Sequence, residues 1–160
     1  PDLKRFTDGG SLLNGYDFVT NEFIGNEIAH IAAGGFRING GTDRNPPWER
    51  TRNNRITDNR LQHYGQDFPS AVGVLLMNTE GNTVAHNEIS HGGYTGVSIG
   101  WVWGYQRSVS RDNLIESNHI HHIGGILSDM GGIYTLGVSP GTVLRGNLIH
   151  HVDANMLRLH

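Results

Sequence analysis

Apolar and polar residues alternate in short runs along this chain, and the runs return at nearly constant intervals. Four times a glycine is followed by an apolar-x-apolar triplet, in residues 35–38, 73–76, 96–99 and 132–135, and residues 156–159 hold a weaker fifth copy. Alternation over three or four residues is typical of short β-strands with one buried face, and no segment keeps a 3.6-residue period for three turns. The pattern therefore predicts short strands and no long helix.

A second phrase, Asn-x-Ile/Leu-x-His, occurs five times and sets the length of the repeating unit. Its asparagines are Asn26, Asn59, Asn87, Asn118 and Asn147, so the steps between them are 33, 28, 31 and 29 residues. Another asparagine comes five residues earlier in four copies (Asn21, Asn54, Asn82 and Asn113), and Thr142 takes this place in the fifth. Self-similarity at a period of roughly 20 to 50 residues is the signature of a solenoid or a propeller.

We predict an all-β fold, a right-handed parallel β-helix solenoid of about five rungs stacked ~4.8 Å apart. The repeated asparagine would form a ladder at a turn, because Asn tolerates left-handed backbone and its amide can bond its copy one rung away. A β-propeller is the alternative, but its four-stranded blades need about 40 to 45 residues. Residues 1–160 would form a single β-helix domain. Neither end shows an amphipathic helix that could cap a solenoid, so we expect a fragment truncated at both ends.

Composition narrows the classes of function. Charged residues make up 17% of the 160 residues, the formal net charge is -3, and there is no basic run, which argues against a nucleic-acid partner. No apolar stretch approaches the ~20 residues of a membrane span. The chain has no cysteine, so disulfides play no part in its stability.

Histidines gather at the ends of the repeats and raise the question of a metal site. His119, His121 and His122, with His150 and His151, have the short spacing that zinc ligands can have. However, five histidines recur at one position of the repeat, which favours a stacked structural ladder. We therefore predict no metal and no cofactor. His119 and His121 break the pattern of the other rungs and are kept as candidate substrate-binding residues.

Loop lengths show where function can lie, because the turns of a solenoid carry its variable residues. The step from the repeat histidine to the glycine that opens the following triplet is five residues in rungs one and three but ten in rungs two and four. The extra residues, 64–69 and 123–129, should therefore lie on the same side of the solenoid. Two further excursions cover residues 42–52 and 100–107.

Two of the three tryptophans, Trp101 and Trp103, fall in one glycine-bounded excursion. Flat aromatic faces beside a rigid sheet are a common platform for sugar rings. The alternative is that both rings fill an apolar gap under a long loop.

Two carboxylates are candidate catalytic groups. Asp129 precedes Gly131 in an inserted loop, and Asp153 stands three residues before the weak fifth triplet. If both rungs keep the same turn, the two carboxyl groups are about 5 Å apart, the separation of a retaining glycosidase pair. Like charges so close would raise one pKa, which suits a general acid. For Asp129 the alternative role is a cap of a glycine-rich turn.

Residues 127–137, Leu-Ser-Asp-Met-Gly-Gly-Ile-Tyr-Thr-Leu-Gly, together with 139–143 and the aromatic stretch 94–104, resemble bacterial right-handed, pectate-lyase-like β-helix proteins that act on glycans. The resemblance points to the β-helical glycoside hydrolase family with α-L-fucosidase and xylanase-type members. It covers residues 80–151, whereas residues 1–80 match only as generic solenoid. It implies two catalytic aspartates, the first at Asp129. The second belongs to a Gly-aromatic-x-Asp-Glu-Gly block that this chain lacks, so on this alignment residues 152–160 are loop and Asp153 is no catalyst.

Three functions stay open. The first is a glycoside hydrolase acting on a polysaccharide outside the cell or in the periplasm, with Asp129 and Asp153 as candidate catalytic residues. The second is a polysaccharide lyase or epimerase, although no acidic cluster stacks beside the outward positions Arg37 and Arg158. The third is a non-catalytic glycan-binding or structural β-helix. The candidate substrate-binding residues are Tyr94, Trp101, Trp103, His119, His121 and Tyr134.

Overall fold

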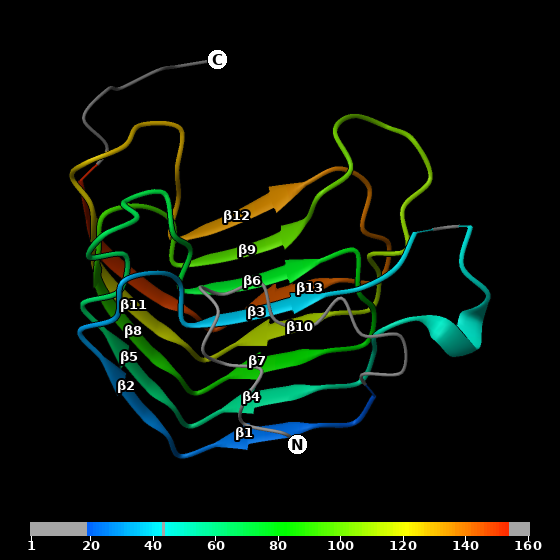
Figure 1. The fold of residues 1–160 in the computed structure, drawn as a ribbon, viewed down its shortest axis with the longest axis horizontal. Coiled ribbons are helices and arrows are strands. Elements are labelled where there is room, and N and C mark those ends of the chain that lie inside the picture. Colours follow the sequence, from blue (N-terminus) through cyan, green and yellow to red (C-terminus); the bar gives the residue numbers. More distant parts are fainter. Residues whose placement is uncertain (1–18, 43, 154–160) are drawn as a thin grey trace.

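In a computed structural model that describes residues 19–42 and 44–153, the chain coils around one axis (Figure 1). Its strands form three parallel sheets along that axis. The first sheet holds β1 (Glu22–Ile24), β4 (Arg55–Thr57), β7 (Thr83–Ala85), β10 (Leu114–Glu116) and β13 (Val143–Arg145). The second holds β2 (Glu27–Ala29), β5 (Arg60–Gln62), β8 (Glu88–Gly92), β11 (His119–Gly124) and β14 (Leu148–Asp153). The third holds β3 (Phe36–Asn39), β6 (Val74–Met77), β9 (Val97–Gly100) and β12 (Ile133–Leu136).

Each complete coil of the described chain contributes one strand to each sheet, which is the architecture of a parallel β-helix. Within the described residues four rungs have all three strands, and a fifth has strands in the first two sheets. The all-β solenoid predicted from the repeat is thus confirmed. The fifth triplet, residues 156–159, lies outside the described residues. The helical content of the described part is one short 3-10 turn, η2 (Pro47–Glu49), and it contains no helix long and apolar enough to cross a membrane.

The core is a set of stacked apolar columns along the axis. The apolar residues that precede each repeat asparagine by three lie in register across the first sheet: Phe23, Ile56, Val84, Ile115 and Leu144. The inward residues of the other two sheets complete the interior, including Leu61, Ile89 and Ile120, and Leu76 and Ile99. Strands this short bury little by themselves, so the stacking of successive coils is what removes their apolar face from water.

Two asparagine ladders hold the corner between the first and second sheets and the corner that precedes the first sheet. In the repeat ladder each amide Nδ2 donates to the Oδ1 of the next copy at 2.8 or 2.9 Å, from Asn26 through Asn59, Asn87 and Asn118 to Asn147. The second ladder runs in the same way from Asn21 through Asn54 and Asn82 to Asn113 at 2.8–3.1 Å. The ladder predicted for the repeat asparagine is therefore confirmed, and the second ladder is an addition from the structure.

The left-handed backbone, however, lies one residue earlier than expected. None of the ladder asparagines has a positive φ; instead the residue before each has one, for example Asp58 (φ 59°) before Asn59 and Ser117 (φ 53°) before Asn118. Before Asn26 the residue with positive φ is Gly25, and glycine adopts this conformation without the strain that a side chain would cause. The ladder asparagine is chosen for its amide rather than for its backbone.

Candidate functional site

The outer face of the third sheet presents one side chain from each rung in a straight column. The register pairs Arg37 with Leu75, Leu75 with Ser98, and Ser98 with Tyr134. Each is the middle residue of a glycine-apolar-x-apolar triplet. Because side chains alternate between the two faces of a strand, the buried residues on either side of the exposed Arg37 place the middle residue of each triplet on the outer face, where Ser98 is itself 3% exposed.

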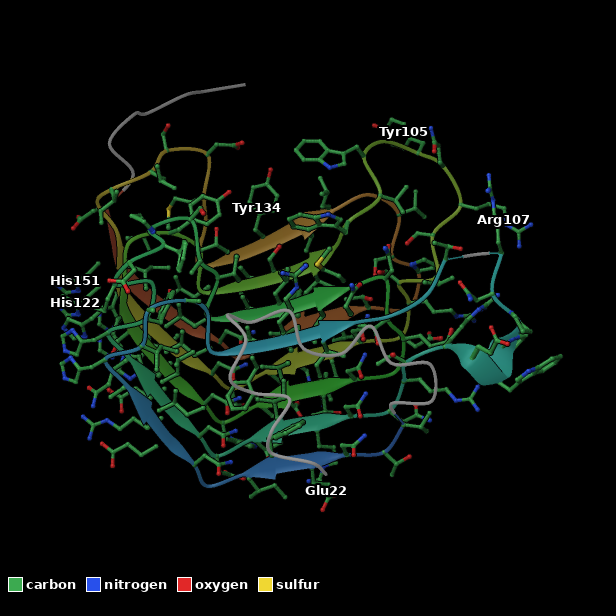
Figure 2. The ribbon with its side chains drawn as sticks, in the orientation of Figure 1. Glu22, Tyr105, Arg107, His122, Tyr134 and His151 are labelled. Atoms are coloured by element: carbon green, nitrogen blue, oxygen red, sulfur yellow. The ribbon has the colours of Figure 1, made fainter. Side chains whose placement is uncertain are left out.

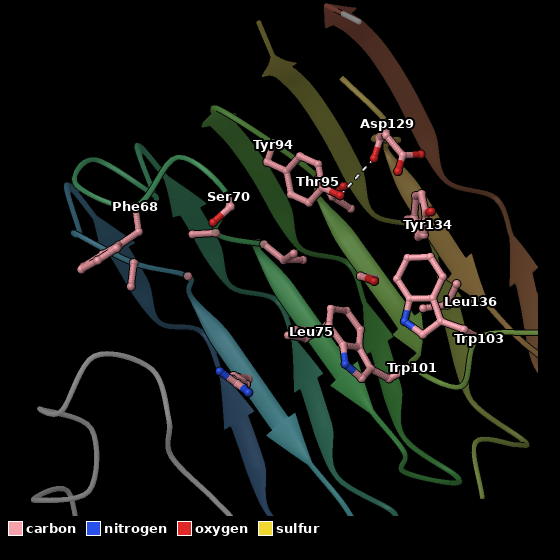
Figure 3. A pocket seen from close by; sticks show the side chains of 16 residues that line it. Phe68, Ser70, Leu75, Tyr94, Thr95, Trp101, Trp103, Asp129, Tyr134 and Leu136 are labelled. Carbon is pink, nitrogen blue, oxygen red and sulfur yellow. Dashed lines mark hydrogen bonds between the residues drawn. The ribbon is translucent and has the colours of Figure 1, made fainter. Parts of the chain in front are cut away.

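A groove of about 530 Å³ lies over this column (Figure 3). One wall comes from the loops that enter the third sheet, with Phe68, Ser70, Tyr94 and Asp129, and the other from the loop that leaves β9, with Trp101 and Trp103. The inserted loops of rungs two and four both line it, which confirms that the two insertions share one side of the solenoid.

The two tryptophans are open to solvent within the groove. Trp101 has 41% of its surface exposed and Trp103 has 69%, so neither ring fills an internal gap. Trp101 also has a φ of 109°, a region that L residues rarely adopt, at a cost of about 1–3 kcal/mol. Such strain is maintained only where the surroundings over-determine it, and here it occurs at a residue that lines the groove.

Two tyrosines flank Asp129. The Tyr94 hydroxyl donates a hydrogen bond of 3.0 Å to the backbone carbonyl of Asp129, and this bond ties rung three to the inserted loop of rung four. Partial burial and the neighbouring Asp129 charge raise the pKa of Tyr134, and Tyr94 and a hydrogen bond with Asp129 act in the same direction. Tyr134 therefore stays a protonated hydrogen-bond donor beside the exposed Asp129 carboxylate.

Asp153 does not accompany Asp129, so the predicted register of the two carboxylates is wrong. Asp153 is the last residue of β14 and pairs with Gly124, while Asp129 lies beyond β11 in the following loop. The alternative placement, with residues 152 and 153 in a loop, is also wrong, because β14 extends through both. The reason is the length of β11. This strand continues for six residues to Gly124, which pairs with Asp153, so the loop that holds Asp129 begins only after the residue that lies beside Asp153. Asp153 is not among the groove-lining residues.

The histidines form a separate array on the second sheet and at its corner (Figure 2). The repeat histidines stack as a ladder from His30 through His63, His91 and His122 to His151, with ring centroids 4.6, 4.6, 5.3 and 4.4 Å apart. All five have φ between 50° and 57°. The predicted structural ladder is confirmed.

His119, His121 and His150 lie on the outer face of the second sheet, beside the last three copies of this ladder, His91, His122 and His151. They contact the ladder histidines, one another and Glu88. His119 Nε2 is 2.7 Å from His150 Nε2, and His121 Nε2 is 3.3 Å from Glu88 Oε1. Because they do not line the groove, the structure does not bring His119 and His121 together with the tryptophans, contrary to the sequence prediction.

Crowding of the imidazoles disfavours their charged form. Burial and the neighbouring His63 and His122 lower the pKa of His91. Burial, with His119 and His122 nearby, also lowers the pKa of His121, although its bond to Glu88 opposes the shift. Across residues 19–42 and 44–153, no three His, Cys, Asp or Glu side chains are arranged to hold a metal ion.

Sequence reasoning placed five of the aromatic and acidic residues in one site but did not place Arg37, Leu75 and Phe68 there. A signal for the first two was present. Arg37 and Leu75 occupy the same triplet position as Tyr134, so the outward column could have been read from the repeat itself. Phe68 could not be found in this way because it lies in a non-repeating insertion.

Comparison with known proteins bears on the fold. A family described as "Right handed beta helix region" matches residues 6–157. A solved structure named "Glycoside hydrolase" superposes with a TM-score of 0.75 at 24% identity, covering 84% of this chain but only 24% of that protein. This likeness shows the fold alone, and the chain spans about a quarter of the solved protein. No curated protein matched the chain.

Proposed function

This chain belongs to the right-handed β-helix family, and from that premise we propose that the groove over its third sheet binds a glycan, with the protein acting as a glycoside hydrolase through Asp129. One observation carries the proposal: exposed aromatic rings and a carboxylate line the same groove. A polysaccharide substrate implies that the protein works outside the cell or in the periplasm.

The aromatic residues suit a sugar chain in shape and chemistry. Sugar rings have apolar faces that lie against aromatic rings and polar edges that need hydrogen bonds. Trp101 and Trp103 offer such faces, and Ser70, Ser98 and the Tyr134 hydroxyl offer bonding groups in the same groove. Support also comes from the solved structure that superposes on this chain, which is named a glycoside hydrolase.

Hydrolysis adds water across the glycosidic bond. The oxygen of water bonds to the anomeric carbon, the bond to the leaving oxygen breaks, and that oxygen takes up a proton. Two carboxyl groups normally share this work, one as acid and one as nucleophile or base. Asp129 would be one of the two, with its loop fixed by Tyr94 and its side chain beside the hydroxyl of Tyr134.

A second candidate function, glycan binding without catalysis, is favoured by one feature of the groove. Asp129 is the sole carboxylate among the described residues that line it. A single carboxylate can bind sugar hydroxyls but does not complete the usual catalytic pair.

Binding can be tested through the tryptophans. Trp48 lies in the 42–52 excursion, away from the groove lining, so Trp48→Phe leaves Trp101 and Trp103 as the only indoles. Titration of this variant with a panel of plant and algal oligosaccharides should change its fluorescence and shield it from acrylamide quenching. Trp103→Ala in the same background should weaken binding about tenfold, and a panel that shields neither indole would refute the proposal.

Catalysis needs a separate assay. New reducing ends and the ultraviolet absorbance of unsaturated uronides are measured together for the parent chain, Asp129→Asn and Asp67→Asn. The Asp67 variant is the matched control, an exposed aspartate of the other inserted loop that does not line the groove. Reducing ends lost only in Asp129→Asn support the hydrolase. Unsaturated products would show a lyase instead, and binding without either product would show a glycan-binding protein.

A further inference from the structure

The groove has opposite charges at its two ends. Asp129 lies in the rung-four loop at one end, and Arg37 on β3 lies at the other. They are the only acidic and the only basic residues among the described groove-lining residues. Leu75 and Ser98, which carry no charge, occupy the positions between Arg37 and Tyr134 in the column.

The charge of Arg37 is available to a ligand. Arg37 is exposed, and none of the ion pairs found among the described residues involves it. Three strand spacings separate Arg37 from Tyr134 along the column, roughly 14 Å. That exceeds the Debye length of about 8 Å at physiological salt, so Arg37 and Asp129 do not neutralise one another.

Arginine differs from the other groove residues in what it recognises. Its planar guanidinium presents paired N–H donors that match a carboxylate or a sulfate, and such charge-assisted bonds are about twice as strong as neutral ones. A rung spacing is close to the length of one pyranose unit, so three rungs correspond to about three sugar residues. The Asp129 end, in contrast, would repel an anionic sugar.

We propose that the groove selects an acidic glycan, whose carboxylate or sulfate is bound by Arg37 about three sugar residues away from an uncharged residue that contacts Asp129. This inference rests on the proposed glycan-binding function and adds the class of substrate and its orientation: the acidic group lies at the rung-one end of the groove and the neutral residue at the rung-four end.

The experiment uses ligand pairs that share a backbone and differ in charge. A hexagalacturonate methyl ester with one free carboxylate, on a terminal residue, is compared with the fully esterified chain, and cellohexaose is compared with a derivative that carries a single 6-sulfate on a terminal residue. Each is titrated into the Trp48→Phe chain by fluorescence at low salt and again in 0.5 M NaCl, a condition that shortens the Debye length. The variants are Arg37→Met, which keeps length without charge, and Arg37→Lys, which keeps charge without the planar fork. Arg44→Met serves as the control, since Arg44 is exposed and does not line the groove.

In at least one pair we expect the acidic member to bind about tenfold more tightly than the neutral one, with the difference reduced by salt. Arg37→Met should abolish this preference, Arg37→Lys should keep part of it, and Arg44→Met should have no effect. Equal binding of both members in both pairs, with affinity still lost in Trp103→Ala, overturns the acidic-glycan inference and leaves the proposed function standing. Absence of binding by all four ligands and by the wider panel overturns both.

Discussion

Tyr94 and Asp129 belong to different rungs, yet the hydroxyl of Tyr94 lies 3.0 Å from the backbone carbonyl oxygen of Asp129 and donates a hydrogen bond to it. The side chain of one wall residue thus fixes the backbone of another. Asp129 has a φ of 61°, so its loop enters a conformation that needs support from outside the loop. Because the acceptor is the backbone carbonyl, the bond positions Asp129 without occupying its carboxylate oxygens.

Tyr94→Phe removes this bond and should therefore loosen residues 125–131. The bond is exposed, so the loss of unfolding free energy should stay within about 0.5–1.5 kcal/mol. Hydrogen exchange of the loop amides should rise, and glycan affinity should fall severalfold. Tyr105→Phe is the control, because Tyr105 is 99% exposed. Unchanged loop exchange in Tyr94→Phe would show that the bond does not position Asp129.

The repeat ladder should be most sensitive at its centre. Asn87 is buried; its amide donates to Asn118 Oδ1 and to the Ile56 carbonyl, and its Oδ1 accepts two bonds from Asn59. Asn87→Ala leaves several buried polar groups without partners, at about 1–3 kcal/mol each, so we expect a loss of about 3–5 kcal/mol in urea unfolding. Asn26→Ala, at the exposed end of the ladder, should cost about 1 kcal/mol. Equal losses at the two sites would contradict a cooperative ladder.

Gly92 should tolerate no side chain while Tyr64 is present. Tyr64 is buried, its hydroxyl donates to the Thr95 carbonyl at 3.1 Å, and a Cβ built at Gly92 overlaps its ring. Gly92→Ala should therefore lower the unfolding free energy by about 1–3 kcal/mol through overpacking. In Tyr64→Ala the same change should cost much less, a coupling that a double-mutant cycle measures. Additive losses would mean that the overlap is relieved by movement elsewhere.

Acidification should destabilise the fold through the histidine array. Burial, with His119 and His122 nearby, lowers the pKa of folded His121, against the opposing bond to Glu88. Near pH 6.5 the unfolded chain therefore binds more protons than the folded chain. The free energy of unfolding should fall as the pH drops below about 7, and it should level off below the pKa of the folded state. Urea midpoints between pH 8 and pH 5 should show this slope. His121→Asn should flatten it, whereas His86→Asn, outside the array, should not.

Much of the scaffold was predictable because its sequence repeats. Asn26 and its copies recur at the near-constant intervals of a stacked coil. The triplets around Arg37 and Tyr134 in the same way predict strands of the third sheet. The equal loop lengths before Gly73 and Gly132 likewise placed both insertions on one side. Periodicity reports which residues share a column, because each coil repeats the backbone path of the one before it.

The site was less predictable, because its parts lie where the repeat is interrupted. Asp153 shows the limit: counting from the fifth triplet put it beside Asp129, while the actual pairing of β11 with β14 puts it beside Gly124. Register depends on hydrogen bonds between strands, and spacing does not reveal where a strand ends and its loop begins. His119 and His121 show the same limit. They were predicted to lie in the site, but they belong to the second sheet, whereas the groove lies over the third.

The sequence by itself determined the coil, its period, its ladders and the side on which its loops gather, because these are properties that each repeat restates. Only the tertiary structure decided that Trp101, Trp103, Tyr94 and Asp129 enclose one groove, and that Arg37 closes its far end. These residues come from three different rungs, and their meeting depends on how irregular loops fold against the outer face of a sheet. Loop conformation is set by non-local contacts, such as the bond from Tyr94 to Asp129, which no local pattern encodes.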